Sequence, residues 1–221
     1  MLTEMADAPR TATATAPRQQ QADQTRERLL GAAWDIVCEA GPAAFSMRTL
    51  ATRANVATGL PFAHFGSREA LLDALRIRAW DQLEAAVVPE PPVDPTTLPA
   101  SGYEAGMRAA MTAIADFALR EPFVYDLVAI VPGMRLGGAV LEREVRAAGR
   151  LVAFLRAGEA AGAFRFESDV VVFALALWTS LQGFVTRMRA DLDPGFRAIQ
   201  QRVLAELLDS FCARIRPEGT R

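Results

Sequence analysis

The sequence has 221 residues, 51% of them hydrophobic, and a formal net charge of −2, so it can bury a substantial core but has no general basic character for nucleic-acid binding. All 24 positively charged residues are arginine, and the absence of lysine excludes a P-loop lysine and a Schiff-base lysine. One histidine, His64, and two distant cysteines, Cys38 and Cys212, cannot form an ordinary zinc site, so we expect neither a metal nor another cofactor.

Residues 1–22 alternate small and polar side chains and lack the apolar stretch of a signal peptide or a spanning helix. Their composition predicts a disordered arm. The two cysteines are typical of small buried residues in a reducing compartment rather than of a disulfide framework, which predicts a cytoplasmic protein.

Residues 24–40 repeat apolar side chains at helical spacing and end at Gly41, which suits the left-handed position after a helix. Ser46 can cap a short second helix, and Asn55 stands where a tight turn between helices needs a left-handed residue. Two helices joined by such a turn predict a helix-turn-helix unit, which places its second helix in the major groove of DNA. The inward face of the helix capped by Ser46 would consist of Met47, Leu50, Ala51 and Ala54.

The third predicted helix carries Pro61 close to its start. With Thr58 as the N-cap residue, Pro61 is the third helical residue, and its missing N–H is one that the first turn leaves unpaired anyway. With Ala57 as the cap, Pro61 would delete the first helical hydrogen bond, and the cap would offer no side-chain oxygen. We therefore expect the helix to begin after Thr58, and Ser67 to cap a longer helix from Arg68.

Beyond residue 75, apolar residues recur at helical spacing around 107–118, 141–155 and 196–215. Two valine-rich runs, 124–131 and 170–173, offer too few partners for a sheet, and we expect both to be helical. The segment 88–99 contains five prolines and is expected to be irregular, separating a short N-terminal part from a larger C-terminal part. The last helix is expected to start at Asp193 and Pro194 and to end before Pro217.

The most apolar stretch covers residues 170–185, which are 16 residues interrupted by Thr179, Ser180 and Gln182. A spanning helix needs about 20 predominantly apolar residues. We therefore expect a core helix and no membrane partner.

Three stretches, TRERLLGAAWDIVCEAG, SMRTLATRANVATG and PFAHFGSREALL, follow one another in the first part with the order and spacing of one family. In them the sequence resembles the TetR family of bacterial transcriptional regulators. The resemblance implies an all-α fold with an N-terminal three-helix helix-turn-helix DNA-binding domain at 23–75. It also implies a C-terminal helical effector-binding and dimerisation domain at 76–221, where the likeness is mostly one of architecture.

The resemblance assigns roles to individual residues. The short third helix would meet base edges through Thr58, Gly59 and Leu60. Phosphate contacts would come from the side chains of Ser46, Arg48, His64 and Arg68. Helix starts at Ser46 and Arg68 favour anions, because free N–H groups and the helix dipole point there. The family usually has Tyr, Gly, Ser and Lys where this sequence has Phe62, Asn55, Ala57 and Arg68. The expected DNA-binding residues are Arg26, Ser46, Arg48, Thr58, Gly59, Leu60, Phe62, His64 and Arg68.

Some of these residues have a plainer interpretation. His64 beside Phe65 also fits a packed surface histidine, although the surrounding motif favours a phosphate contact. Arg143, Arg146 and Arg150 share one helical face, but interspersed glutamates favour a solvated face over a second nucleic-acid surface.

The second part is expected to bind a small, largely apolar effector, since its helical faces combine aromatic and flexible side chains with few ionisable groups. A strongly charged effector would need a buried partner, and Asp116 and Arg120, the nearby candidates, fall at a helix edge. A stripe of this kind is more often simply core. The expected pocket residues are Tyr103, Met107, Met111, Phe117, Phe123, Tyr125, Trp178 and Gln182.

The last two predicted helices carry more apolar surface than one chain can cover, which predicts an isologous four-helix interface in a homodimer. The expected interface residues are Val171, Leu175, Trp178, Phe196, Val203, Leu207 and Phe211.

Together these features predict a transcriptional regulator, by resemblance a repressor, that binds a palindromic double-stranded DNA operator and is released by its effector. An enzyme on a helical bundle would need a nucleophile with a base, or paired carboxylates, and the sequence offers no such constellation. A helical interaction module without specific DNA binding is the other alternative, to which Phe62 and the weak charge balance point.

Overall fold

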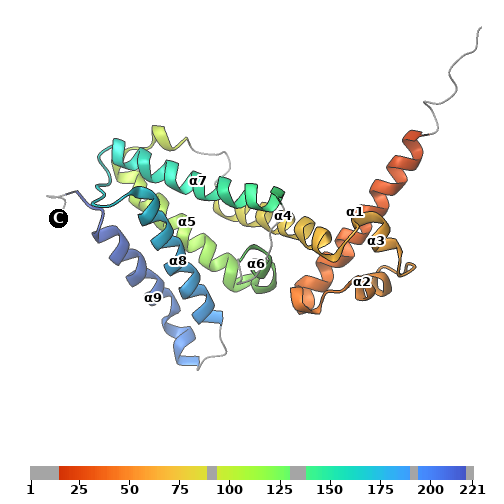
Figure 1. Ribbon diagram of the computed structural model, residues 1–221. Coiled ribbons are helices and arrows are strands. Elements are labelled where there is room, and N and C mark those ends of the chain that lie inside the picture. Colours follow the sequence, from red (N-terminus) through yellow and green to blue (C-terminus); the bar gives the residue numbers. More distant parts are fainter. Residues whose placement is uncertain (1–14, 89–93, 130–137, 190–193, 218–221) are drawn as a thin grey trace, which may run out of the picture. The chain divides into compact units, whose positions relative to one another are not determined.

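A computed structural model describes residues 15–88, 94–129, 138–189 and 194–217, and within these ranges every regular element is a helix (Figure 1). The predicted all-α fold is confirmed. The chain divides into two compact units, residues 1–75 and 76–221. The division falls inside helix α4, which runs from Arg68–Val87.

The N-terminal unit contains α1 (Thr15–Ala40), a 3-10 turn η1 (Pro42–Ala44), α2 (Met47–Arg53), α3 (Leu60–Phe65) and the start of α4. Helix α2 packs against α1 and α3. The apolar side chains that recur at helical spacing in these helices meet in one core, where they are almost fully buried. This core consists of Leu29, Ala33, Val37, Phe45, Leu50, Ala51, Leu71 and Leu75.

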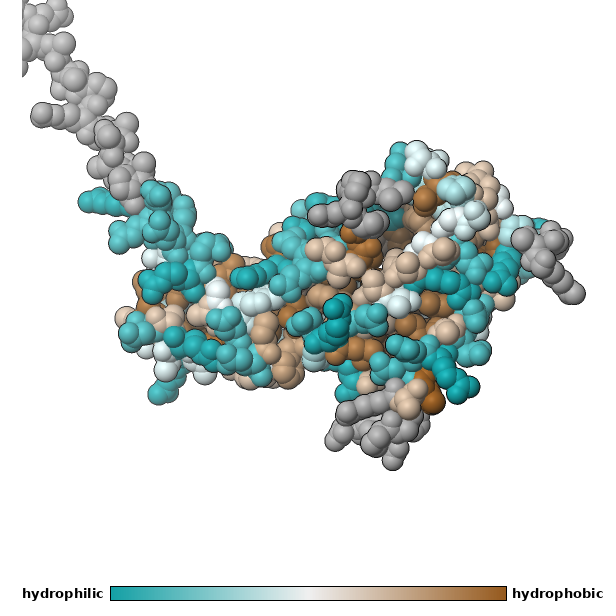
Figure 2. Space-filling model, turned by 180° about the vertical axis from the view of Figure 1, so that it is seen from behind, coloured by the Kyte–Doolittle hydropathy of each residue, from teal (hydrophilic) through white to brown (hydrophobic). Residues whose placement is uncertain are grey.

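Helix α1 begins earlier than the sequence predicted. Residues 15–22 were expected to belong to a disordered arm, but they form the first turns of α1. Alanine, arginine and glutamine favour helix, and lengthening an existing helix needs no new nucleus. Pro17 is tolerated because it lies in the first turn. The surface here is hydrophilic (Figure 2), so this extension rests on helix propensity rather than on burial.

The C-terminal unit contains η2 (Pro95–Thr97), α5 (Ala100–Arg120), α6 (Pro122–Val128), α7 (Gly138–Ala160), α8 (Val170–Arg189) and α9 (Pro194–Ala213). The valine-rich run 170–173 lies in α8, as predicted. The run 124–131 is helical only as far as Val128, where α6 ends, and residues 130 and 131 lie outside the described ranges. Helix α8 packs against α5, α7 and α9. Its inward face is therefore the centre of this unit, with Leu177 and Leu181 fully buried.

Helix α8 has 20 residues, more than the 16-residue stretch considered from sequence, and continues to Arg189. Among the described residues it is the one helix whose length and composition would allow it to cross a membrane. We interpret it as a core helix, because three other helices pack against it.

A row of aromatic rings joins the helices of this unit. Tyr103 on α5 lies 6.0 Å from Phe164 between centroids, Phe164 lies 6.0 Å from Phe166, and Phe166 lies 5.1 Å from Phe173 on α8. Phe173 in turn lies 5.5 Å from Phe211 on α9. All four pairs meet edge to face, an arrangement that aromatic quadrupoles favour.

Gly158 on α7 lets this row of rings approach the helix closely. A Cβ atom at this position would lie 2.5 Å from Cδ2 of Phe164 and 3.0 Å from Cδ1 of Tyr103. At Gly149, on the same helix, a Cβ atom would meet nothing within 4 Å. Only the first of these two glycines is therefore required by packing.

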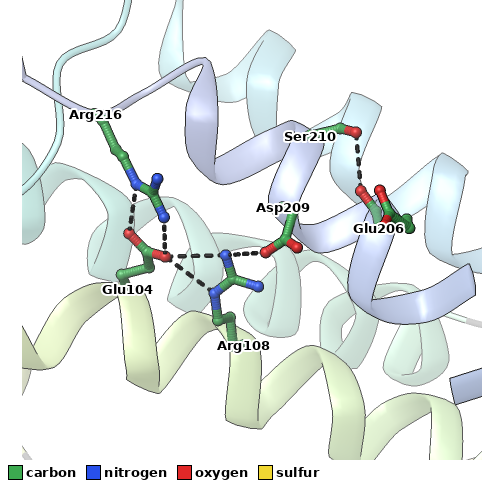
Figure 3. Close-up of polar contacts among 6 residues, drawn as sticks. All are labelled: Glu104, Arg108, Glu206, Asp209, Ser210 and Arg216. Atoms are coloured by element: carbon green, nitrogen blue, oxygen red, sulfur yellow. Dashed lines mark hydrogen bonds and ion pairs between the residues drawn. The ribbon is translucent and has the colours of Figure 1, made fainter. Parts of the chain in front are cut away.

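A charge cluster joins α9 to α5 (Figure 3). Glu104 accepts from Arg216 at 2.9 Å and from Arg108 at 3.0 Å, and Arg108 also pairs with Asp209 at 2.7 Å. Arg216 first, and then Arg108, lower the pKa of the Glu104 carboxyl to about 2. One partly buried guanidinium, that of Arg108, thus holds two carboxylates.

The arginines of α7 were expected on a solvated face, but two of them make ion pairs between helices. Arg150 donates from Nη2 to Oε1 of Glu84 on α4 at 2.6 Å, and Arg143 pairs with Asp81 and Glu84. They tie α7 to the part of α4 that belongs to the C-terminal unit, which supports the view that this face is structural.

Two boundary predictions meet the edges of the described residues. The proline-rich segment contains a 3-10 turn, in which Oδ1 of Asp94 accepts from the Thr96 N–H at 2.9 Å, while residues 89–93 lie outside the described ranges. The expected cap Asp193 also lies outside them, and α9 ends at Ala213, before Pro217.

The two cysteines differ in their surroundings. Cys212 is buried, as predicted, and burial raises the pKa of its thiol to about 11. Cys38 on α1 is exposed, so the prediction of two buried cysteines is wrong for it.

Candidate nucleic-acid interface

The start of α2 is fixed by a reciprocal cap. Oγ of Ser46 accepts from the Thr49 N–H at 3.0 Å, and Oγ1 of Thr49 accepts from the Ser46 N–H at 2.9 Å. The predicted cap at Ser46 is confirmed. The Ser46 hydroxyl also lies 3.0 Å from Oγ1 of Thr49. An anion can compete with Oγ1 of Thr49 for the hydrogen of the Ser46 hydroxyl, and the cap to the Thr49 N–H would remain.

The turn between α2 and α3 depends on Asn55. This residue has φ 52°, the left-handed conformation predicted for it. Beyond it the Val56 N–H donates to the Ala51 carbonyl at 3.0 Å, which closes the end of α2. Asparagine therefore fulfils the role that the family usually gives to glycine.

Helix α3 begins later than predicted. Its N-cap is Gly59 rather than Thr58, no side chain caps it, and Pro61 is the second helical residue. The reason lies in the turn before it, where the Leu60 N–H already donates to the Ala57 carbonyl at 2.9 Å. The first helical bond runs from the Ala63 N–H to the Gly59 carbonyl at 3.0 Å, so Pro61 still removes no helical hydrogen bond.

Helix α3 ends at Gly66, which has φ 76° and whose N–H donates to the Phe62 carbonyl at 2.8 Å. Pro61 and Phe65 point into the core and are buried, whereas Phe62 is 48% exposed. Phe62 lies on the outer face of the helix together with the exposed Thr58 and Gly59 before it.

Arg26, expected to contact DNA, and Arg68, expected at a phosphate, are both partly engaged inside the unit. Nη1 of Arg26 donates to the His64 carbonyl at 2.8 Å, and its guanidinium lies 4.2 Å from the centroid of the Phe65 ring. Nε and Nη2 of Arg68 both lie 3.3 Å from the Phe45 carbonyl. These two arginines hold α3 and α4 in place, a role that the sequence did not indicate.

Arg48 has an exposed side chain on α2. It lines a shallow hollow beside that helix together with Thr49, Thr52 and Arg53. Arg53 is paired with Glu39 of α1, whose pKa it lowers, so Arg48 supplies the more available positive charge at this hollow.

In the C-terminal unit most of the expected pocket residues fill the core. Tyr103 donates its hydroxyl to the Pro95 carbonyl and packs 5.4 Å from the Phe154 ring, so it is a structural residue in this conformation. Phe123 is 36% exposed, and Trp178 and Gln182 are half-buried. The remaining members, Met107, Met111, Phe117 and Tyr125, are buried.

The expected dimer residues differ in their exposure. Val171 and Leu175 on α8 and Val203 on α9 are exposed large apolar residues, and Val172 and Ile199 are further ones. Phe211 does not belong with them, because it is buried against Phe173 inside its own chain. Trp178 and Leu207 are half-buried, and the side chain of Phe196 lies outside the described part of the chain.

Two family models match the chain. "Bacterial regulatory proteins, tetR family" matches residues 29–75, and "Tetracyclin repressor-like, C-terminal domain" matches residues 107–211. A curated relative, the HTH-type transcriptional repressor Rv3405c of Mycobacterium tuberculosis, is 36% identical over 72 residues, which are 33% of this chain and 38% of that protein. The likeness therefore spans little more than a third of that relative's length.

Solved structures extend the likeness over most of the chain. The TetR family transcriptional regulator PfmR from Thermus thermophilus is 24% identical with a TM-score of 0.58, covering 82% of this chain and 97% of that one. RolR in complex with resorcinol is 24% identical with a TM-score of 0.54, covering 91% and 99%. At these identities the likeness shows the fold. With both family models and the helix-turn-helix geometry, it follows that the chain belongs to the TetR family of bacterial transcriptional regulators.

Proposed function

We propose that this regulator is a repressor that binds a palindromic operator as a homodimer and leaves it when a small, largely apolar effector binds. The observation that carries the proposal is the exposed surface at the start of α3, which consists of Thr58 and Gly59 before the helix and Phe62 on its outer face. Buried Pro61 and Phe65 fix the opposite face of the same helix. A rigid helix with an exposed tip suits insertion into the major groove.

Phosphate contacts orient the protein on DNA without reading its sequence. Arg48 is the first candidate for such a contact, because its side chain is exposed. The hydroxyl of Ser46 can donate to a second phosphate oxygen once it leaves Thr49. Arg26 and Arg68 keep N–H groups beyond those bound to carbonyl oxygens, so they and His64 can add weaker contacts.

Base contacts would come from Thr58, Gly59, Leu60 and Phe62. The phenyl ring of Phe62 has no hydroxyl, so we expect it to contact a thymine methyl group or sugar rather than a phosphate. A Cβ atom at Gly59 would have no atom of the described residues within 4 Å. Packing inside the unit therefore does not require glycine at this position, which is consistent with close approach of DNA.

Dimerisation would use the exposed apolar residues of α8 and α9. Leu175 is 57% exposed and Val203 is 38% exposed, and soluble chains rarely leave such rows of apolar side chains uncovered. An isologous interface gives the dimer twofold symmetry, and the operator would then contain two inverted half-sites.

The effector would bind in the C-terminal unit, whose core is rich in aromatic and methionine side chains. The resorcinol complex of RolR supports a small organic molecule, and the repressor relative supports negative control. Release requires that the effector bind the DNA-incompetent state more tightly, because equal affinity for both states would shift nothing. Such a regulator acts in the cytoplasm, where bacterial DNA lies.

The test is binding of the purified protein to the DNA upstream of its own gene, measured against salt concentration. Arg48→Ala should flatten the slope of log K against log salt by about two, since each of two protomers loses about one phosphate contact. Arg156→Ala, which removes an exposed charge on α7, should leave the slope unchanged. Absence of sequence-specific binding would favour a helical interaction module, and an equal effect of both variants would remove Arg48 from the interface.

A further inference from the structure

Tyr125 is a buried polar residue whose hydroxyl no contact among the described residues explains. It lies in the middle of α6 and is only 3% exposed, yet its hydroxyl has no hydrogen-bond partner within the described residues. Burial raises the pKa of this hydroxyl to about 12, so it is a neutral donor at any physiological pH. A buried hydroxyl without a partner is costly, and native proteins rarely keep one without a use.

Arg189, at the end of α8, has a second such group. Its Nη1 pairs with Oδ1 of Asp126, the residue next to Tyr125, at 2.8 Å. Its Nε is buried and has no hydrogen-bond partner within the described residues. Because Asp126 is the chain neighbour of Tyr125, this ion pair brings the Arg189 guanidinium to the part of α6 that carries Tyr125.

The Tyr125 hydroxyl and Nε–H of Arg189 can both donate a hydrogen bond, so the partner that each of them lacks is an acceptor. The positive charge of one of them favours an anionic acceptor. The ion pair with Asp126 leaves Arg189 able to bind a second acceptor. The comparable Arg108 in the same unit binds two carboxylates, those of Glu104 and Asp209 (Figure 3). Those two guanidinium side chains are similarly covered, with 22% and 26% of their surface exposed.

We propose that Tyr125 and Arg189 form a subsite between α6 and α8 for the carboxylate of a small organic acid. The carboxylate would accept from the Tyr125 hydroxyl and from Nε–H of Arg189. Buried Val185, one turn before Arg189, and Val128, on α6, suit an apolar body next to the acid group. The inference rests on the proposed effector binding and defines its chemistry: the effector is a weak acid with an apolar body, for which the sequence offered only Asp116 and Arg120 as partners.

The experiment is calorimetric titration of the full chain, without DNA, with benzoate and octanoate and with the uncharged benzamide and octanamide. At least one acid should bind about tenfold or more tightly than its amide. Tyr125→Phe and Arg189→Gln should each lower the affinity for that acid by about tenfold to a hundredfold, because each removes a hydrogen bond to a charged group. Arg187→Gln, which removes an exposed charge near the same end of α8, should change the affinity little.

A second measurement separates binding from folding. Without ligand, Tyr125→Phe should raise the melting temperature, because it removes an unpaired buried hydroxyl. A lower melting temperature would mean that the hydroxyl has a partner such as an ordered water, and this would overturn the subsite. Failure of both acids to bind, or equal affinity for acid and amide, would overturn it too. Operator binding is measured separately, so a protein that binds DNA but no acid refutes only this inference, and acid binding without a DNA response refutes only effector release.

Discussion

The two units of this regulator place their candidate contact residues in opposite ways. The N-terminal unit buries Pro61 and Phe65 so that Thr58, Gly59 and Phe62 lie at the surface. The C-terminal unit turns most of its candidates inward, where they pack against one another. The exposed residues at the start of α3 can therefore change without loss of the fold, whereas the buried candidates on α5 and α6 also form the core that stabilises the C-terminal unit.

The largest effect should come from an added methyl group in the C-terminal unit. Gly158→Ala places a Cβ atom against Phe164 and Tyr103, and overpacking in a close-packed core should cost about 2 kcal/mol of unfolding free energy. Gly149→Ala on the same helix meets nothing and should stabilise the protein by about 0.5–1 kcal/mol. Denaturant titration of both variants measures the difference. Equal stabilities would show that the Phe164 and Tyr103 rings can move aside without cost.

The same substitution at the tip of α3 should leave stability alone and weaken DNA binding. Gly59→Ala meets no protein atom and should change unfolding free energy by less than about 0.5 kcal/mol. If the backbone approaches a base edge, operator affinity should fall about tenfold, in the range of one lost base contact. Gly31→Ala on α1 is the control, and unchanged affinity at Gly59 would place DNA elsewhere.

Substitutions of Ser46 and Thr58 test which hydroxyl caps a helix. Ser46→Ala should cost about 1 kcal/mol because Ser46 caps α2, whereas Thr58→Ala should cost less than about 0.5 kcal/mol because Thr58 makes no cap. Thermal unfolding of the two variants measures the difference. A larger loss at Thr58 would restore the helix start predicted from the sequence.

The smallest effect on stability is expected when the pH is lowered. The pKa of Glu104 is lowered from 4.5 to about 2, so its ion pairs stabilise the folded state above pH 4.5 and this contribution fades as the pH falls towards 2. Because the cluster is partly exposed, the loss should stay below about 1 kcal/mol. The stability difference between the parent and Glu104→Gln should shrink over this pH range. A difference independent of pH would mean that the pairs contribute nothing.

Local rules accounted for much of the N-terminal unit. Gly41 and Asn55 have positive φ, and Ser46 and Ser67 cap α2 and α4, as their positions in the sequence indicate. Thr58 does not cap the helix because the Leu60 N–H already donates to the Ala57 carbonyl in the preceding turn. Capping preference alone cannot show which of two neighbouring residues the turn leaves free.

Long-range packing accounted for most of the remaining differences. Phe211 has the spacing of an interface residue, but Phe173 comes from another helix to cover it. The hydroxyl of Tyr103 reaches the Pro95 carbonyl in a segment that the sequence marks only as irregular. Nε of Arg189 has no partner among the described residues, and no pattern in the sequence predicts this, since it depends on which residues of α6 lie beside Arg189. Periodicity shows which residues face inward but not which residues they meet.

The contrast between Cys38 and Cys212 offers a direct means of following the regulator in solution. A maleimide dye attacks the thiolate of an accessible cysteine, and burial together with a pKa of about 11 protects Cys212. The unmodified protein should thus take one label per chain, on α1 of the N-terminal unit. In a dimer carrying one donor and one acceptor dye, energy transfer would report the separation of the two DNA-binding units as operator or organic acid is added.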